Sequence, residues 1–500
     1  MEMTKQDFLA VLNNEIKLNH AFIDGLWCDI ESDMEHSLID PSIGQVIATT
    51  KLCLTKHVDS AANAAKAAFV GWSQTTRQQR ADYLNAIASA MSARFDTLVG
   101  LSVLNNGKPI EEAKIDVSDA IACYQYYADL ISQQPQRTQV TTKEEGVKLY
   151  KVLEPVGVCA LIVPWNFPMV TTAWKLAPAL AAGCTVILKP SEITLIPELV
   201  LGDILIEIGL PKGVVNILPG AAEVGTAMTM HPLVDKVSFT GSNAVGEKVM
   251  RQASSSIKDI SLELGGKSAI IVCEDADINS ACDIIIAGIF FNAGQICSAT
   301  SRLLVHKNIA DDLYQILRKK TQELVVGDGF DSDTIMGPLV SEQQLKQVQQ
   351  YFGIAKQEGL SCLTGGKLMR ADVNNLENNK GYFVEPTVYM NVPRSSRLWK
   401  EEVFGPVLVT HEFSTDQEAI ILANDSKYAL AATVVSRNES HAMEMALQIK
   451  AGHIWINEIQ IVLPEAGWGG FKQSGIGREL GEDGLAAYQL SKHILLTGSE

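Results

Sequence analysis

The stretch GVCALIVPWNFPMVTTAWKLAPALAAGCTVIL, residues 157–188, decides the fold. Its single charge is Lys175, so hydropathy alone would suggest a helix that crosses a membrane. Three prolines and an asparagine interrupt the apolar run, and proline breaks the interior of a helix; these residues are Pro164, Pro168, Pro178 and Asn166. The stretch therefore predicts a buried strand, a loop, a helix and a second buried strand, which form one βαβ unit.

Further units of the same kind follow along the chain. Strands are expected at 157–163, 186–188, 214–217 and 236–239, and helices at 171–182, 197–208, 223–230 and 244–253. Repeated strand–helix units predict a doubly wound parallel sheet, which binds ligands at the carboxyl ends of its strands. A second α/β series begins near Ser268, with AIIV at 269–272, and runs to about Gly467. The predicted fold class is therefore α/β, with two or three domains in 500 residues.

Composition narrows the classes of partner. With 58 acidic and 41 basic residues, the formal net charge is −17. This charge argues against nucleic acid and anionic membranes as partners, because both need basic patches, and it weakly favours cationic ligands. The nine cysteines include no CxxC pair, so neither a disulfide framework nor a metal site is expected. Charges at the start of the chain argue against export, and a cytoplasmic location is expected.

Three short motifs carry the candidate chemistry. FFNAGQICS at 290–298 puts Cys297 behind a glycine-containing loop, LELGGK at 262–267 holds Glu263, and PWN at 164–166 holds Asn166. Taken singly, these residues are most simply a buried thiol, a solvated charge and a turn residue. Together they supply a nucleophile, a base and an amide donor, the groups needed to oxidise an aldehyde through a covalent thioester.

These motifs make the chain similar to the aldehyde dehydrogenase superfamily, from about Ile23 to about Lys492. The resemblance implies a Rossmann-like NAD-binding domain, a catalytic α/β domain and a small β element for oligomerisation. Their expected bounds are 1–134, 156–265 and 468–485 for the NAD-binding domain, 266–467 for the catalytic domain, and 135–155 and 486–500 for the oligomerisation element. The hairpin at 135–155 and the tail read as edge strands, which invite pairing, so a homodimer or homotetramer is expected.

The resemblance also implies the reaction. Cys297 attacks the aldehyde carbon, the Asn166 side chain and the Cys297 backbone N–H hold the oxyanion, and Glu263 activates water to hydrolyse the thioester. Lys175 and Glu479 are accessory groups by the same resemblance, and a structural ion pair is an equal alternative for Glu479. A CoA-acylating relative commonly lacks the hydrolytic glutamate. A catalytically silent relative would have lost one of the three main groups, so both alternatives are disfavoured.

The cofactor signals are of unequal strength, and the usual GxGxxG fingerprint is absent. Gly241 and Ser242, in TGSNAVG at 240–246, open a helix that could receive a pyrophosphate, although they could also be turn residues. Lys189 and Glu192 follow the strand at 186–188, where the resembled family binds the adenine ribose. A carboxylate there repels a 2′-phosphate, so Glu192 predicts NAD over NADP.

A further set of cofactor residues comes from the resemblance. In EEVFGP at 401–406, Glu402 would hold the nicotinamide ribose and Phe404 would pack beside the nicotinamide, with a solvated acidic turn as the alternative. The other residues implied in the cofactor site are Ile162, Trp165, Gly220, Gly225 and Leu264.

Four aromatic residues near the catalytic motifs suggest the substrate; they are Phe167, Trp174, Phe291 and Trp468. Such rings attract an ammonium group through cation–π contacts of about 1 to 2 kcal/mol when desolvated. The alternative is an apolar tunnel in a broad-specificity alkyl aldehyde dehydrogenase. GQICSATSR at 294–302 and WGG at 468–470 resemble the plant-type betaine aldehyde and aminoaldehyde dehydrogenases, which favours a cationic aldehyde.

Other residues refine this expectation. Asp116 and Asp119 share one helical face and match acidic residues at that branch's substrate entrance, although they could be plain surface charges. By resemblance to that branch, His453 would lie near the bottom of the pocket, at a position expected to be small or aliphatic, and phenylalanines stand at 167 and 291 where the branch commonly has Tyr and Trp. A slim ω-aminoaldehyde, such as 4-aminobutanal or 3-aminopropanal, is therefore expected ahead of betaine aldehyde.

Overall fold

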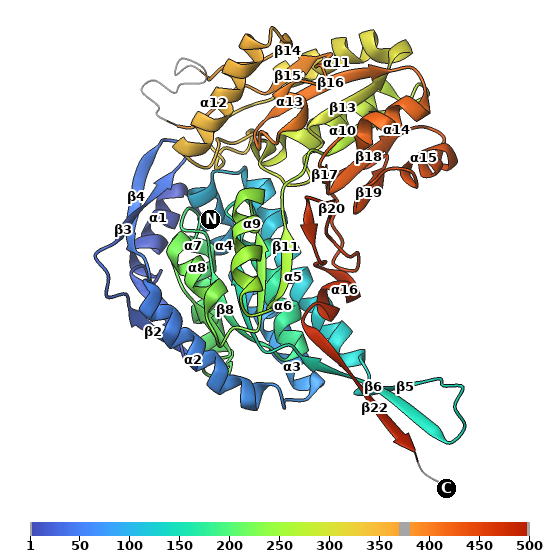
Figure 1. Ribbon diagram of the computed structural model, residues 1–500. Helices are drawn as coiled ribbons and strands as arrows, with labels where there is room; N and C mark the ends of the chain where they lie inside the picture. The colour runs from blue at the N-terminus through green and yellow to red at the C-terminus, as the bar shows by residue number, and fades with distance from the viewer. Residues whose placement is uncertain (1–2, 370–380, 498–500) are drawn as a thin grey trace.

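The computed structural model describes residues 3–369 and 381–497. Figure 1 shows two sheet-centred lobes, one above the other, and an arm, formed by a three-stranded sheet, that projects from the lower lobe. Residues 1–2 and 498–500, which belong to the predicted terminal segments, lie outside the described residues.

The lower lobe is built on an eight-stranded sheet in the order β2-β1-β9-β8-β7-β10-β11-β21. The strands from β9 to β11 run parallel, and β7 and β8 are the two strands of the 157–188 unit. Antiparallel strands extend both edges, with β1 beside β9 and β21 beside β11. The bounds are β1 (His20–Ile23), β2 (Leu26–Asp29), β7 (Val158–Ile162), β8 (Thr185–Lys189), β9 (Val215–Ile217), β10 (Lys236–Thr240), β11 (Asp259–Glu263) and β21 (Gly475–Ile476).

Helices cover both faces of this sheet. Helices α2, α8 and α9 lie against one face, and the layer of α3 to α7 and α16 lies against the other. In α6, Pro168 stands in the first turn, where its missing N–H costs no bond, and Gly183 ends the helix at a φ of 97°. The bounds are α1 (Lys5–Asn14), α2 (Thr55–Trp72), α3 (Arg77–Ala93), α4 (Phe95–Asn106), α5 (Ile110–Gln133), α6 (Pro168–Ala182), α7 (Ile196–Glu207), α8 (Ala222–Met230), α9 (Asn243–Ser254) and α16 (Gly481–Ala486).

The upper lobe has a seven-stranded sheet in the order β14-β15-β16-β13-β12-β18-β19, parallel except for β14. Its strands are β12 (Ala269–Val272), β13 (Arg302–His306), β14 (Ser361–Thr364), β15 (Thr387–Met390), β16 (Val407–Phe413), β18 (Ala431–Val435) and β19 (His453–Ile456). Its helices are α10 (Ile278–Phe290), α11 (Ala310–Gln322), α12 (Glu342–Gln357), α13 (Arg397–Lys400), α14 (Asp416–Asn424) and α15 (Glu439–Ala446), with short 3-10 turns η1 (Phe291–Gly294) and η2 (Lys307–Ile309). The predicted α/β fold class with two α/β series is confirmed.

The arm consists of β5 (Arg137–Val140), β6 (Val147–Pro155) and β22 (Gln489–Thr497), all antiparallel. Four large apolar side chains of β22 are 46 to 67% exposed; they are Leu490, Ile494, Leu495 and Leu496. A projecting strand with exposed apolar side chains matches the predicted edge strand. Its part in oligomerisation, like the predicted domain bounds, stays a prediction.

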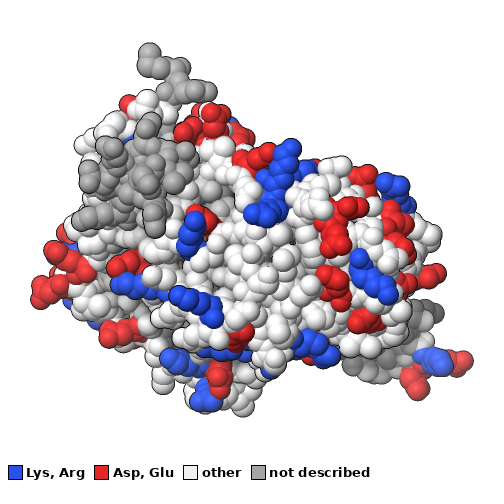
Figure 2. All heavy atoms as spheres, turned by 90° about the horizontal axis from the view of Figure 1, so that it is seen from above, with Lys and Arg blue, Asp and Glu red and all other residues white. Residues whose placement is uncertain are grey.

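Smaller pieces complete the fold. β3 (Glu35–Asp40) and β4 (Gln45–Lys51) form an antiparallel hairpin, and β17 (Tyr428–Ala429) pairs with β20 (Phe471–Lys472) where the chain returns to the lower lobe. On the face in Figure 2, basic and acidic side chains are interspersed and do not gather into one patch. In the described ranges, no single helix could span a membrane by length and apolarity; α3 and α4 pass that test only as a pair bent by 72°.

Candidate active site

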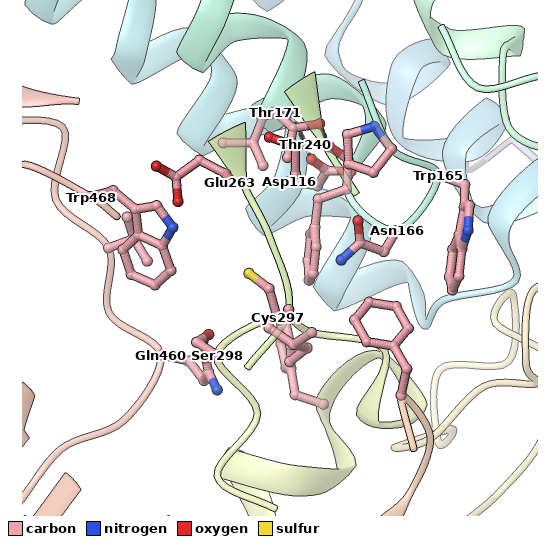
Figure 3. Close-up of a pocket in the computed structure, with 18 of the residues that line it drawn as sticks. Asp116, Trp165, Asn166, Thr171, Thr240, Glu263, Cys297, Ser298, Gln460 and Trp468 are labelled. Carbon is pink, nitrogen blue, oxygen red and sulfur yellow. Dashed lines mark hydrogen bonds between the residues drawn. The ribbon is translucent and has the colours of Figure 1, made fainter. Parts of the chain in front are cut away.

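A cavity of about 800 Å³ lies between the lobes, at the carboxyl ends of β7, β10 and β11. This edge is where an open parallel sheet presents its ligand-binding loops. Asn166, Glu263 and Cys297 all line the cavity. Figure 3 shows the Cys297 sulfur between the Asn166 side chain on one side and Glu263 on the other. The fold therefore brings together the three groups that the motifs predicted.

A strained turn delivers Cys297 to the cavity. After α10, η1 has positive φ angles at Asn292 (48°), Ala293 (51°) and Gly294 (72°). A Cβ on Gly294 would lie 2.2 Å from a backbone carbonyl oxygen, so only glycine fits there. The Gln295 side chain fixes the turn by donating to the Asn292 carbonyl oxygen at 2.9 Å. Strain of this kind persists only where the surrounding structure enforces it, and it clusters at functional sites.

The environment of Cys297 keeps its thiol protonated. Burial, followed by the negative charges of Glu402 and Glu263, raises the pKa of Cys297 to about 12. The backbone N–H groups of Ser298 and of Cys297 itself act in the opposite direction. Because the thiolate is the nucleophile, ionisation of Cys297 is coupled to the charge on these two carboxylates.

Glu263 is the last residue of β11 and is 4% exposed. Neither of its carboxylate oxygens has a hydrogen-bond partner among the described residues. Burial, and next the charge of Glu479, raises the pKa of Glu263 well above its usual range, while Lys175 and Arg478 oppose this shift. A carboxylate with free oxygens and a raised pKa can accept a proton from water near neutral pH.

An ion pair lies near Glu263, and its acidic member, Glu479, also lines the cavity. Lys175 of α6 is fully buried and pairs with Glu479. The Ser238 hydroxyl lies between them, 3.2 Å from Lys175 Nζ and 3.3 Å from Glu479 Oε1. The second Glu479 oxygen has no partner in the part of the chain that the structure describes. The pair is compatible with both alternatives from the sequence, a structural ion pair and a proton relay, and the relay stays a prediction.

The Asn166 amide is held in place. Its Nδ2 donates to the Gln295 backbone carbonyl oxygen at 2.9 Å. The backbone carbonyl oxygen of Asn166 accepts from Lys108 Nζ at 2.9 Å and from Asn292 Nδ2 at 3.0 Å. A primary amide carries two N–H donors, so one of them remains for a ligand. In Figure 3 the side chain faces Cys297 across the cavity.

The residues predicted for the nicotinamide side line the same cavity. Glu402 Oε1 accepts from the Gly266 N–H at 2.9 Å, and burial raises the pKa of Glu402 to about 7. Phe404 has a φ of 56°, and its ring meets Trp165 edge-on with centroids 5.3 Å apart. The wall on this side also includes Gly241, Ser242 and Leu264.

The residues predicted for the adenine ribose form a second group at the carboxyl end of β8, outside the cavity lining. Lys189 Nζ donates to the Gly220 carbonyl oxygen at 2.6 Å and lies 3.3 Å from Glu192 Oε2. A Cβ on Gly225 would lie 3.7 Å from Ile162 and 3.8 Å from Lys189. The Glu192 side chain is 31% exposed, so its carboxylate can meet a ligand. The two groups together follow one edge of the sheet, as an extended dinucleotide requires.

The four predicted aromatic side chains line the cavity as two pairs. Phe167 and Phe291 stack with centroids 6.2 Å apart and planes 11° apart. Trp174 and Trp468 meet at 5.6 Å with planes at 52°. Ile459 and residues 461–463 add apolar side chains to this wall, and Gln460 and Asp119 add polar ones. The arrangement fits a cationic tail among rings as well as an alkyl chain.

His453 is not at the bottom of the pocket, and this corrects the sequence-based expectation. Its ring packs behind Trp468, 5.2 Å from that ring, and 4.7 Å from Trp455, and it is not among the residues that line the cavity. Burial lowers the pKa of His453. His453 can therefore act on the pocket only through the position of Trp468.

Asp116 is not an entrance charge, and the expectation of two acidic residues at the entrance is wrong for it. Asp116 lines the cavity, but its side chain is fully buried and pairs with Lys108 at 3.2 Å. Asp119 is partly exposed on the cavity wall, and burial, followed by the charge of Asp116, raises the pKa of Asp119 to about 6. The helical spacing showed that the two share a side of α5, but it could not show how deep each would lie.

Sequence reasoning missed several polar residues of the site. Gln344 of α12 donates to the Phe404 carbonyl oxygen at 2.7 Å, and Ser298 donates to Gln460 Oε1 at 2.7 Å. Lys108 holds the Asn166 backbone, as described above. Gln344, Gln460 and Lys108 stand outside the quoted motifs, and Ser298 stands inside one without a predicted role. A positive φ of 60° at Gln460 is visible only in the structure.

The chain matches a family model described as "Aldehyde dehydrogenase family" over residues 27–494. It is 43% identical over 487 residues to aminoaldehyde dehydrogenase 1, peroxisomal, of Pisum sativum, covering 96% of each chain. It is 40% identical to betaine aldehyde dehydrogenase, chloroplastic, of Beta vulgaris, again covering 96% of each chain. A solved structure of betaine aldehyde dehydrogenase from Staphylococcus aureus in complex with NAD+ superposes with a TM-score of 0.95 at 39% identity, covering 99% of this chain and 97% of that one.

The names of these relatives also correct one expectation. The cytoplasmic location expected from composition is wrong by this comparison, since the plant relatives are named as peroxisomal or chloroplastic. All nine cysteines are free, as a reducing compartment allows. Cysteine usage and net charge do not distinguish the cytosol from other reducing compartments, which is why composition could not settle the location.

Proposed function

The chain belongs to the aldehyde dehydrogenase family, and on that premise we propose that it oxidises an ω-aminoaldehyde to the carboxylic acid with NAD. The observation that carries this proposal is the convergence of Cys297, Asn166 and Glu263 on one cavity. The names of its relatives, aminoaldehyde and betaine aldehyde dehydrogenases, support the substrate class.

The proposed reaction follows from the chemistry of these three residues. Cys297, once deprotonated, attacks the carbonyl carbon and forms a C–S bond, and the carbonyl electron pair moves onto oxygen. The free Asn166 N–H and the Cys297 backbone N–H then donate to this oxyanion. When bound, NAD supplies the hydride acceptor that allows a thioester to form on Cys297. Glu263 takes a proton from water, whose oxygen displaces the thiolate and gives the acid.

The residues around the cofactor fit NAD. Glu402 and Phe404 lie beside Cys297, and the Lys189–Glu192 pair lies farther along the same sheet edge. The complex of the Staphylococcus aureus relative with NAD+ supports the same cofactor. Glu192 would bond ribose hydroxyls and repel a 2′-phosphate.

Glu192 should therefore determine the choice of cofactor. We expect wild-type kcat/KM with NAD to exceed that with NADP by at least about tenfold, since hydrogen bonds to charged groups contribute about 1.5 to 3 kcal/mol. Glu192→Gln should narrow this ratio, whereas Glu223→Gln, an exposed acid on neighbouring α8, should leave it unchanged. Equal kcat/KM for the two cofactors in the wild type would contradict the role of Glu192.

The expected preference for a substrate with an amino group can be tested with pairs of charged and uncharged aldehydes of equal length. 4-Aminobutanal and 3-aminopropanal should exceed the uncharged aldehyde of equal length by roughly tenfold in kcat/KM, because one desolvated cation–π contact contributes about 1.4 kcal/mol. Trp174→Ala or Trp468→Ala should remove most of this preference, and Trp27→Ala on remote β2 should retain it. NADH absorbance measures each rate. Equal efficiency on butanal and 4-aminobutanal would leave the second candidate, a general alkyl aldehyde dehydrogenase, which the apolar cavity wall favours.

Assembly into a homodimer or homotetramer is part of the proposal. The exposed apolar side chains of β22 on the projecting arm support it, because a strand of this kind gains by pairing with or packing on another subunit. Static light scattering of the purified chain would measure the mass of the assembly.

A further inference from the structure

One side of α5 carries a buried row of charged residues. Lys108 precedes the helix, and Glu112 and Asp116 follow at intervals of four, so the three lie on one side of it. They are 1%, 6% and 1% exposed. Buried charges are costly unless each finds partners, so the contacts of these three residues indicate what the row does.

Lys108 links α5 to the loop that carries Asn166. Its ammonium donates to the backbone carbonyl oxygen of Asn166 at 2.9 Å and to Asp116 Oδ2 at 3.2 Å. It also lies 4.0 Å from the centroid of the Phe167 ring. A single cation therefore contacts the oxyanion donor's backbone, a ring of the pocket and a buried carboxylate.

The two carboxylates of the row hold the neighbouring segments. Glu112 accepts from the backbone N–H of Asn292, at 3.0 and 3.1 Å, inside the strained turn before Cys297. Asn292 Nδ2 in turn donates to the same Asn166 carbonyl oxygen that Lys108 contacts. Asp116 Oδ1 accepts from the Val170 N–H in the first turn of α6 at 2.9 Å. The row thus ties the nucleophile turn and the oxyanion loop to one rigid helix.

We propose that Lys108 is a positioning residue for the oxidation, holding the Asn166 amide at the place where the oxyanion forms. The inference rests on the proposed oxyanion role of Asn166 and does not depend on which aldehyde is the substrate. Among the described residues, only Lys108 and Asn292 donate to the Asn166 backbone carbonyl oxygen, so loss of Lys108 leaves this oxygen with one donor and allows the loop to shift. A displacement of about 1 Å at a reacting group costs on the order of 10²-fold in rate.

A double-mutant cycle tests this role with propanal and NAD. Lys108→Met should lower kcat/KM by roughly tenfold to hundredfold in the native background, because the Asn166 side-chain N–H is no longer held at hydrogen-bonding distance and angle from the oxyanion. In an Asn166→Ala background the same substitution should change kcat/KM by less than about twofold, because the amide that it positions is absent. A merely structural lysine would lower the rate by the same factor in both backgrounds, and that additive result would overturn the proposal.

Controls separate positioning from loss of the fold. Lys114→Met removes an exposed lysine of the same helix and should leave kcat/KM unchanged. The affinity for NAD and the number of Cys297 thiols titrated should stay at wild-type values in Lys108→Met. If Lys108→Met does not fold, the double variant Lys108→Met with Asp116→Asn removes both charges of the Lys108–Asp116 ion pair. This double variant then replaces Lys108→Met in the cycle.

Two other outcomes count against the proposal. Wild-type kcat/KM in a folded Lys108→Met enzyme would overturn it and leave the oxyanion role of Asn166 intact. An Asn166→Ala enzyme as fast as the wild type would overturn both. Absence of an amine preference bears on the substrate alone.

Discussion

Cys297→Ala should abolish aldehyde oxidation and leave NAD binding intact. We expect kcat to fall by at least about 10⁴-fold, as it does when the nucleophile is removed from other covalent catalysts. The reason is that the C–S bond, the oxyanion and the thioester all depend on this sulfur. NADH absorbance measures the rate, and quenching of protein fluorescence by NAD measures the affinity.

A second cysteine provides the control. Cys362 is exposed and remote from the cavity, so Cys362→Ala should keep the wild-type rate. Iodoacetamide should inactivate the wild type and the Cys362 variant at the same rate. This rate should increase as pH rises, because the raised pKa of Cys297 keeps its thiol protonated at neutral pH and only the thiolate reacts. Appreciable turnover by Cys297→Ala would end the assignment of the nucleophile.

Glu263→Gln should separate the two halves of the reaction. We expect one equivalent of NADH in a burst, followed by a steady rate lower by about 10² to 10⁴, the usual contribution of a general base. Oxidation needs only Cys297 and the oxyanion donors, whereas hydrolysis needs a group that takes a proton from water. Stopped-flow absorbance resolves the burst, and acid quenching followed by mass spectrometry would detect the acyl group on Cys297.

The pH dependence follows from the same group. The pKa of Glu263 is raised, so below it the carboxyl is protonated and cannot act as a base. The hydrolytic rate of the wild type should therefore rise as pH passes upward through this raised pKa, and the rise should be missing in Glu263→Gln. Glu247→Gln, at an exposed position on α9, should keep both the rate and its pH dependence. A variant at position 263 without a burst and at full rate would be incompatible with this role.

The central sheet could be predicted because the residues within each of its parallel strands already indicate a buried strand. β7 is a continuous apolar run and β8 has an apolar centre at 186–188, and glycine or proline lies close to the ends of both strands, as is typical of strands buried on both faces. The antiparallel edges were not predictable, because β21 has only two residues and acquires its strand geometry from pairing with β11. Long-range pairing, rather than propensity, determines such short strands.

The residues of the candidate site likewise fall into those that the sequence could predict and those that it could not. Cys297, Glu263 and Asn166 could be predicted because each stands in a motif whose residue types carry the chemistry. Asp116 could not be placed correctly, because a spacing of three on a helix shows a shared side and not its burial. Lys108 was missed because its importance comes from contacts with residues 58 positions later in the chain.

The arm has a consequence for the order of events during synthesis. Strand β22 pairs with β6 through nine residue pairs, from Gln489 with Pro155 to Thr497 with Val147. These partners are separated by more than three hundred residues, and β22 is the last described element to leave the ribosome. Until then β6 has only β5 beside it, and contacts so distant in sequence form late and slowly. The arm can therefore be completed only after residues 489–497 have been translated, so any subunit contact that uses β22 forms later than the sheets of both lobes can be synthesised.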